Sequence, residues 1–169
     1  KTWEPLFDEG FPSSEQLPRK FEVEIVEETV NGKRQVIQRI NGGKLGNSLT
    51  DNRMASDDYR FHDVFHIAYA AVLGWSPVIR ALLRHKRKSK PEIDAAEDGA
   101  RAILIEEGVS TLIFHHAERL DYFRATNSLD YGLLKTVESF VRGFEVSHRP
   151  LWQWEQAILE GFKIFRRIK

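Results

Sequence analysis

The spacing of apolar residues in the C-terminal part of the chain most constrains its fold. From residue 57 onward, apolar side chains recur every three or four positions, as along the buried face of an α-helix. We therefore expect a mainly α protein, a helical bundle whose core spans residues 57–169. The spacing predicts helices over residues 57–73, 77–85, about 92–123, 131–144 and 150–168.

The N-terminal part has a different pattern. Residues 1–20 contain several prolines and are expected to form an irregular arm. Strand-like runs at residues 21–26 and 34–40 flank Asn31-Gly32, a dipeptide typical of a tight β-hairpin turn. The polar, glycine-rich stretch at residues 41–52 is expected to be a loop. The prediction is thus a small N-terminal β-hairpin beside the helices.

Length and composition restrict the class of protein. The chain has 169 residues, so we expect a single domain over 1–169, with the arm, hairpin and loop in residues 1–52. It contains no cysteine, which excludes disulfides and thiolate metal sites. Its 25 basic and 25 acidic residues balance, so a nucleic-acid partner is not expected. With neither a signal segment nor an apolar run of roughly 20 residues, we expect a cytoplasmic protein without a membrane partner.

Ionisable side chains interrupt an otherwise apolar predicted helix. His62, Asp63 and His66 fall within one arc of roughly 100° on this helix, which is apolar nearly all round. A helix of that kind belongs at the centre of a bundle. The three side chains are therefore expected to be buried together.

A second predicted helix carries two adjacent carboxylates, Glu106 and Glu107, in its apolar middle. Burying an unpaired carboxylate costs several kcal/mol, and a divalent cation removes that cost together with the mutual repulsion. If the two helices pack side by side, Asp63, His66, Glu106 and Glu107 become candidate metal ligands. The structural alternative is that Glu106 pairs with Arg101 or with a histidine.

The donor types limit which cation such a site could hold. An all-oxygen set from Asp63, Glu106 and Glu107 favours Mg or Mn, the two cations that we expect first. His62 and His66 argue for a transition metal, so Zn or Fe also fits the sequence.

A basic run begins in the second predicted helix and continues beyond it. Within this run, Arg84, Lys86 and Lys88 are candidates to bind the phosphate groups of a substrate, because Arg and Lys pair with phosphate oxygens. The alternative is a solvated basic helix end, which the helix dipole favours. The run comprises Arg80, Arg84, His85, Lys86, Arg87, Lys88 and Lys90.

Part of the chain resembles a known family. The stretch from Arg60 to about His116 is similar to MazG-like C-terminal domains, and within it a set of residues resembles the last helices of MazG-type all-α nucleoside triphosphate pyrophosphohydrolases. The resemblance implies Mg bound by carboxylates on paired helices, cleavage of a nucleoside triphosphate to monophosphate and pyrophosphate, and a homodimer. Asp63 matches the family's terminal aspartate, and Glu106-Glu107 could stand in for its glutamate pair. The residues that carry it are Asp63-Val64, Ala70, Leu73-Gly74, Leu82-Leu83, Lys86, Lys88 and Pro91.

The chain also departs from the family pattern. Its aspartate helix precedes its glutamate helix, and Arg60 and Ser110 stand where the family has glutamates. His62 and His66 are foreign to the family's ligand set.

Three functional hypotheses follow. The leading one is a metal-dependent nucleotide pyrophosphohydrolase in which His62 or Glu107 is the general base. The second is a degenerate MazG-like module that binds a nucleotide or dimerises without catalysis. The third is an HD-type phosphohydrolase, suggested by the adjacent His62-Asp63, although such enzymes need a further upstream histidine and a downstream aspartate.

Overall fold

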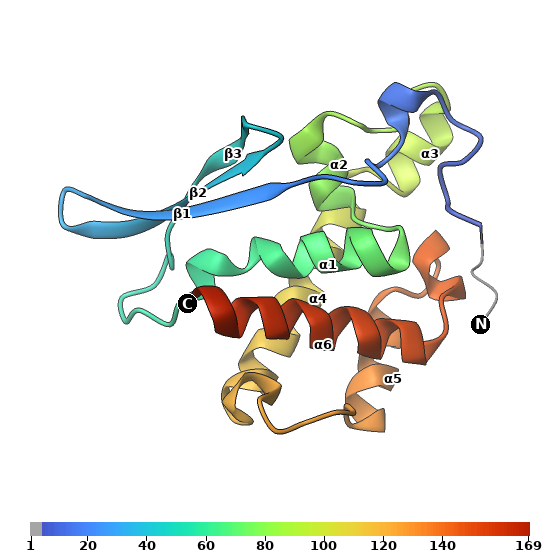
Figure 1. The fold of residues 1–169 in the computed structure, drawn as a ribbon. Helices are drawn as coiled ribbons and strands as arrows, with labels where there is room; N and C mark the ends of the chain where they lie inside the picture. The colour runs from blue at the N-terminus through green and yellow to red at the C-terminus, as the bar shows by residue number, and fades with distance from the viewer. Residues whose placement is uncertain (1–4) are drawn as a thin grey trace.

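The protein is mainly α, with a small N-terminal sheet, in a computed structural model that describes residues 5–169 (Figure 1). Residues 1–4 of the predicted arm lie outside the described residues. Short 3-10 turns lie at Ser13–Glu15, Tyr59–Phe61, Asp121–Phe123 and Glu145–His148. The strands are β1 (Val23–Val30), β2 (Lys33–Ile40) and β3 (Gly43–Leu49), and the helices are α1 (Asp63–Leu73), α2 (Pro77–Leu83), α3 (Pro91–Ala96), α4 (Ala100–Glu118), α5 (Tyr131–Phe140) and α6 (Leu151–Ile168).

The sheet is an antiparallel meander in the order β1-β2-β3. The predicted hairpin is confirmed, with Asn31 and Gly32 at positive φ in the turn between its strands. The prediction that residues 41–52 form only a loop is wrong, because β3 occupies most of that stretch. Asn41-Gly42 forms a second turn at positive φ, and Leu45 is buried at the edge of the sheet. The turn at Asn41-Gly42 and the burial of Leu45 are thus sufficient for a strand to form, although this stretch is mostly polar.

Several predicted helix boundaries are also wrong. The first helix begins at Asp63 rather than residue 57, after a 3-10 turn, and the fourth ends at Phe140 rather than 144. The expected long helix at 92–123 is two helices, α3 and α4, and ends at Glu118. Gly99 lies immediately before α4 and packs closely on the preceding turn. A Cβ at this position would lie 2.2 Å from the Ala95 carbonyl oxygen. The chain therefore changes direction at Gly99, and the periodicity of apolar residues alone does not reveal this break.

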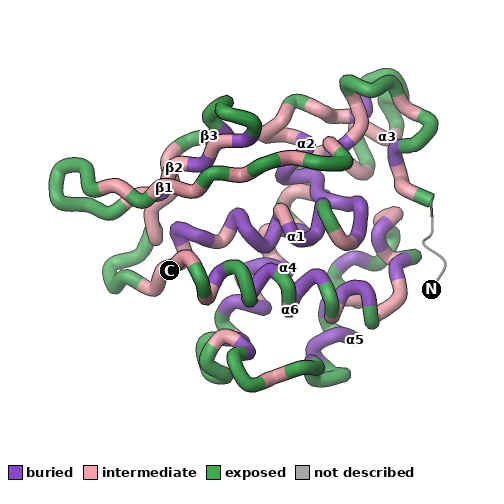
Figure 2. The backbone as a smooth tube through the Cα atoms, viewed as in Figure 1, coloured by how far each residue is buried: buried purple, intermediate pink, exposed green. Residues whose placement is uncertain are grey.

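The core centres on α1, which is buried along nearly its whole length (Figure 2). Helix α6 packs side by side with it (Figure 1), and the rings of Phe65 and Phe162 stack with centroids 4.4 Å apart. Gly161 allows this approach, since a Cβ there would lie 3.3 Å from both Ala68 Cβ and Phe65 Cδ1. Close packing on α6 leaves another face of α1 free to contact α4, which positions the polar residues described below.

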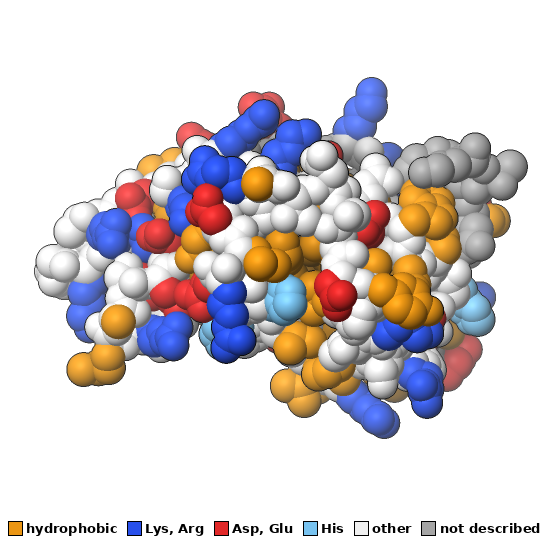
Figure 3. Space-filling view, turned by 90° about the horizontal axis from the view of Figure 1, so that it is seen from below, with side chains coloured by type: hydrophobic (Ala, Val, Ile, Leu, Met, Phe, Trp, Pro, Cys, Tyr) orange, Lys and Arg blue, Asp and Glu red, His pale blue; other side chains and the backbone are white. Residues whose placement is uncertain are grey.

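The surface shows no segregation of charge on the face seen in Figure 3, where acidic and basic side chains are interspersed around a group of apolar ones. No single helix within residues 5–169 is long and apolar enough to span a membrane. The segments 59–73 and 77–83 reach that threshold only when taken together, and they meet at a bend of 105°.

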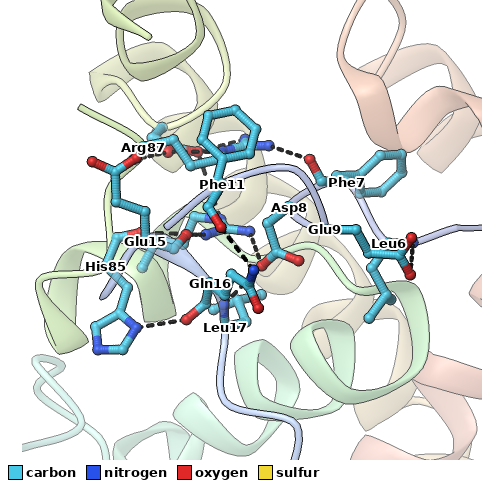
Figure 4. A network of polar contacts seen from close by, with 12 residues as sticks. Leu6, Phe7, Asp8, Glu9, Phe11, Glu15, Gln16, Leu17, His85 and Arg87 are labelled. Atoms are coloured by element: carbon cyan, nitrogen blue, oxygen red, sulfur yellow. Dashed lines mark hydrogen bonds and ion pairs between the residues drawn. The ribbon is translucent and has the colours of Figure 1, made fainter. Parts of the chain in front are cut away.

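A buried ionic network holds the N-terminal arm on the helices (Figure 4). Arg80 donates to the Asp8 carboxylate at 2.8 Å and to the Glu15 carbonyl oxygen at 2.7 Å. Arg87 donates to Asp98 and to Glu145, each at 2.7 Å. The arm is thus fixed through its backbone and the carboxylates of Asp8 and Glu15, although it has little regular secondary structure.

Replacing Asp8 with Asn should destabilise the protein, because it leaves the buried Arg80 guanidinium without its closest carboxylate. A loss on the order of 3–5 kcal/mol at pH 7 is expected for a fully buried pair. Burial tends to raise the pKa of Asp8, but hydrogen bonds from Arg19, the Leu17 amide and Arg80 outweigh burial and lower it below 3.8. The contribution of Asp8 is therefore present above that value and disappears as the pH falls through the lowered pKa.

Urea unfolding of wild type and variant at pH 7 and at acid pH measures this difference. Glu9→Gln, an exposed neighbour, is the control and should change stability little. Equal stability of wild type and Asp8→Asn at pH 7 would contradict the role of the network.

Candidate metal centre

The predicted arcs of α1 and α4 do face one another. Nδ1 of His66 lies 2.8 Å from Glu106 Oε1, and its Nε2 lies 3.4 Å from Glu107 Oε2. Nε2 of His62 lies 3.3 Å from Asp63 Oδ1 and 4.0 Å from Glu107 Oε2. Five ionisable residues chosen from the sequence therefore form one cluster, which we call the histidine–carboxylate cluster.

Both histidines use Nδ1 for a hydrogen bond away from the centre of the cluster. His62 Nδ1 lies 2.8 Å from the Tyr59 carbonyl oxygen, which can only accept, so this nitrogen carries a proton. The Tyr59 ring stacks on the His62 ring at 4.4 Å and holds its plane. His66 Nδ1 is paired with Glu106 in the same way. Hydrogen bonds of this kind at Nδ1 are typical of metal-binding histidines, whose Nε2 is then available to a cation.

Glu106 lies behind His66 rather than beside the other carboxylates. Its Oε1 accepts from Ser76 Oγ at 2.6 Å as well as from His66, and its Oε2 accepts from the Val78 amide at 2.8 Å. The sequence left two partners open for Glu106, Arg101 or a histidine. The structure pairs it with a histidine, His66, and Arg101 is exposed. With both oxygens occupied, Glu106 is suited to orient His66, and its predicted role as a ligand remains a prediction.

The protonation states follow from burial and neighbouring charge. Burial alone would lower the pKa of His66, but Glu106 and Glu107 outweigh it and raise the pKa to about 10. Burial, aided by His66, lowers the pKa of His62 despite the attraction of Asp63. Burial also opposes ionisation of Glu107, yet its bond to His66 keeps its pKa below the usual value. In the metal-free protein, His66 is therefore a cation between two carboxylates.

The cluster fits a divalent cation by its chemistry. Ligand atoms from His62, Asp63 and His66 all lie within 4.8 Å of one another. Ligands of one transition-metal ion, each about 2.1 Å from it, are separated by up to about 4 Å, so small side-chain rotations suffice. His66 Nε2 is buried and forms no well-directed hydrogen bond among the described residues; its contact with Glu107 Oε2 is long, at 3.4 Å, so a cation would satisfy this nitrogen better. His62 is only 12% exposed and Glu107 39%, so Glu107 is the member most open to solvent.

The sequence analysis missed Gln38, which reaches the cluster from β2. Its Nε2 donates to Asp63 Oδ2 at 2.6 Å, and its side chain is buried. A signal was available, since Val36, Gln38 and Ile40 alternate on one face of the predicted strand, and a glutamine between two apolar residues there would be buried. Which residue it would meet, however, depends on how the sheet packs on α1.

The structure does not bring the predicted phosphate-binding residues to this cluster. Arg84 ends α2 in a left-handed conformation, and its side chain is exposed like that of Lys88. Lys86 lies 3.9 Å from Asp94. All three follow the end of α2 opposite to Val78, whose amide contacts Glu106, a separation of roughly 10 Å for a helix of this length. Their role in phosphate binding stays a prediction.

Replacing Glu106 with Gln should lower the melting temperature of the metal-free protein strongly. The introduced amide nitrogen, itself a donor, would face a hydrogen-bond donor where Glu106 has an acceptor oxygen. The His66 cation would also lose its closest carboxylate. The free energy of unfolding should fall by on the order of 3–5 kcal/mol. Glu107→Gln should cost much less, since Glu107 is partly exposed. Thermal unfolding in chelator compares the two, and equal losses would contradict the distinction between an orienting and an open carboxylate.

The profile described as MazG C-terminal domain matches residues 2–169. Searches of curated proteins and of solved structures returned no match. Because the profile covers nearly the whole chain, including the sheet and both helices of the cluster, this chain belongs to the MazG C-terminal domain family.

Proposed function

We propose that this domain is a metal-dependent hydrolase that cleaves a phosphoanhydride bond in a nucleotide. The observation that carries the proposal is the arrangement of the cluster, in which two oriented imidazoles and two carboxylates converge between buried helices. Family membership supports a relation to nucleotide pyrophosphohydrolases without specifying this chain's activity.

His62, Asp63 and His66 are the proposed ligands, because a ligand atom of each lies within 4.8 Å of those of the other two. Two imidazole nitrogens suit Mn²⁺, Fe²⁺ or Zn²⁺ better than Mg²⁺, which prefers oxygen ligands and retains water. Of Mg²⁺ and Mn²⁺, the two cations expected first from the sequence, Mn²⁺ therefore fits better. A bound divalent cation would acidify a water molecule and neutralise charge on the leaving pyrophosphate.

Glu107 is the proposed general base. It is ionised, since its pKa lies below the usual value, and it is the most exposed of the four residues. A base must lie beside the attacking water, and Glu107 Oε2 lies 4.0 Å from His62 Nε2 and 3.4 Å from His66 Nε2, next to the proposed cation. It would take a proton as the water oxygen attacks the α-phosphorus of a nucleoside triphosphate. The bond from that phosphorus to the bridging oxygen breaks, and pyrophosphate leaves with the bridging oxygen.

One observation favours a second candidate, phosphomonoester hydrolysis of the HD type. His62 and Asp63 are adjacent in sequence and both face the cluster, together with a second histidine and a further carboxylate. The reaction products separate the two candidates: pyrophosphate from a triphosphate indicates the first, and orthophosphate from a monophosphate indicates the second. A homodimer, implied by the resemblance, stays a prediction.

Activity is tested on protein stripped with chelator and reloaded with Mn²⁺, Zn²⁺ or Mg²⁺, then incubated with a panel of nucleotides. We expect monophosphate and pyrophosphate with Mn²⁺. Glu107→Gln should lower the rate by at least about 100-fold, the typical contribution of a general base, while still binding the cation. His66→Gln should lose the cation itself, because it removes a buried ligand.

The matched control is Glu118→Gln, an exposed carboxylate on the same helix, which should keep full activity. If the wild type binds none of these cations, the proposal of a metal centre is wrong. If it binds a cation but hydrolyses no nucleotide, the domain is a binding or dimerisation module instead of an enzyme.

A further inference from the structure

The sheet contributes one buried polar side chain to the interior, Gln38 on β2. Along this strand Val36, Gln38 and Ile40 are all buried, and Gln38 is only 2% exposed. The pairing of β2 with β3 is irregular at this point: Val36 pairs with Leu49, whereas Gln38 pairs with Leu45. Irregular pairing of this kind is used near functional sites to redirect a side chain. Gln38 therefore occupies a specialised position in the sheet.

We propose that Gln38 is a positioning residue of the metal centre, an inference that rests on the proposed function. Its Nε2 donates to Asp63 Oδ2 at 2.6 Å. That bond leaves Asp63 Oδ1, which lies 3.3 Å from His62 Nε2, as the oxygen directed toward the histidines. Gln38 thus fixes Asp63 as a ligand through one oxygen.

The other end of the amide supports a second contribution. Gln38 Oε1 is buried and has no hydrogen-bond partner among the described residues. A buried amide oxygen that accepts no hydrogen bond is unfavourable, so a donor is expected beside Gln38 Oε1. No donor within residues 5–169 reaches Oε1, whereas a water molecule held by a cation would present two O–H groups. We assign Oε1 as an acceptor for such a water.

Glutamine is the side chain that meets both demands. A glutamate here would repel Asp63 and add charge to a site that already has three carboxylates. An apolar side chain would leave Asp63 Oδ2 unpaired in a buried position. Only a neutral group with a donor and an acceptor satisfies Asp63 and a water together.

Cobalt binding tests the inference independently of catalysis, because Co²⁺ reports both affinity and ligand geometry through its visible absorption. Gln38→Met keeps the length of the side chain and removes both hydrogen bonds. We expect it to weaken Co²⁺ binding by about 10–100-fold, the usual effect of losing an outer-shell partner, and to change the absorption bands. Gln38→Glu serves as a second variant if Met impairs folding, and it should also change the bands.

The matched control is Gln153→Met. Gln153 is likewise buried and donates to the Val72 carbonyl oxygen at 2.7 Å, away from the cluster. This variant should lose stability and keep the Co²⁺ affinity and spectrum of the wild type. A Gln38→Met protein that binds Co²⁺ with wild-type affinity and spectrum would overturn the inference and leave the metal centre intact. A wild type that does not bind Co²⁺ would overturn both.

Discussion

The buried pair of His66 and Glu106 is the interaction on which the rest of the structure depends. It joins the middle of α1 to the middle of α4 at 2.8 Å, and the same carboxylate accepts from Ser76 and Val78 at the start of α2. Three helices therefore meet at one charged side chain. A buried pair of this kind is costly unless every donor and acceptor is matched, so it fixes how the helices are placed more than it adds stability.

The composition of the cluster was accessible from sequence because helical periodicity alone places its members. His62, Asp63 and His66 share an arc of one helix, and adjacent glutamates in an apolar helix need a partner wherever they lie. Periodicity does not say, however, which carboxylate will face which atom. The sequence predicts a metal-ligand role for both Glu106 and Glu107, whereas the structure buries Glu106 against Ser76 and Val78 and leaves Glu107 partly exposed.

The features that the sequence did not reveal depend on contacts and backbone geometry that a pattern of apolar residues does not show. The basic run is one example. Arg87 is buried because it pairs with Asp98 and Glu145, which lie further along the chain, whereas its neighbour Lys88 is exposed. Strand β3 and the break at Gly99 are others, because each is decided by packing or backbone geometry rather than by a pattern of apolar residues. The mainly α class, by contrast, rests on local periodicity and is confirmed.

The way in which the arm is held has a consequence for dividing the chain into pieces. The change in composition between residues 52 and 57 suggests a truncation there that would keep only the helices. Such a truncation would remove Asp8 and Gln38, so the retained helices would carry an Arg80 without its closest carboxylate and an Asp63 without its amide donor. It would also uncover Ala70 and Ile79, which pack with Leu17 and Ile40. We therefore expect the helical segment alone to be less stable than the whole chain, and fragments expressed for study should include the arm and sheet.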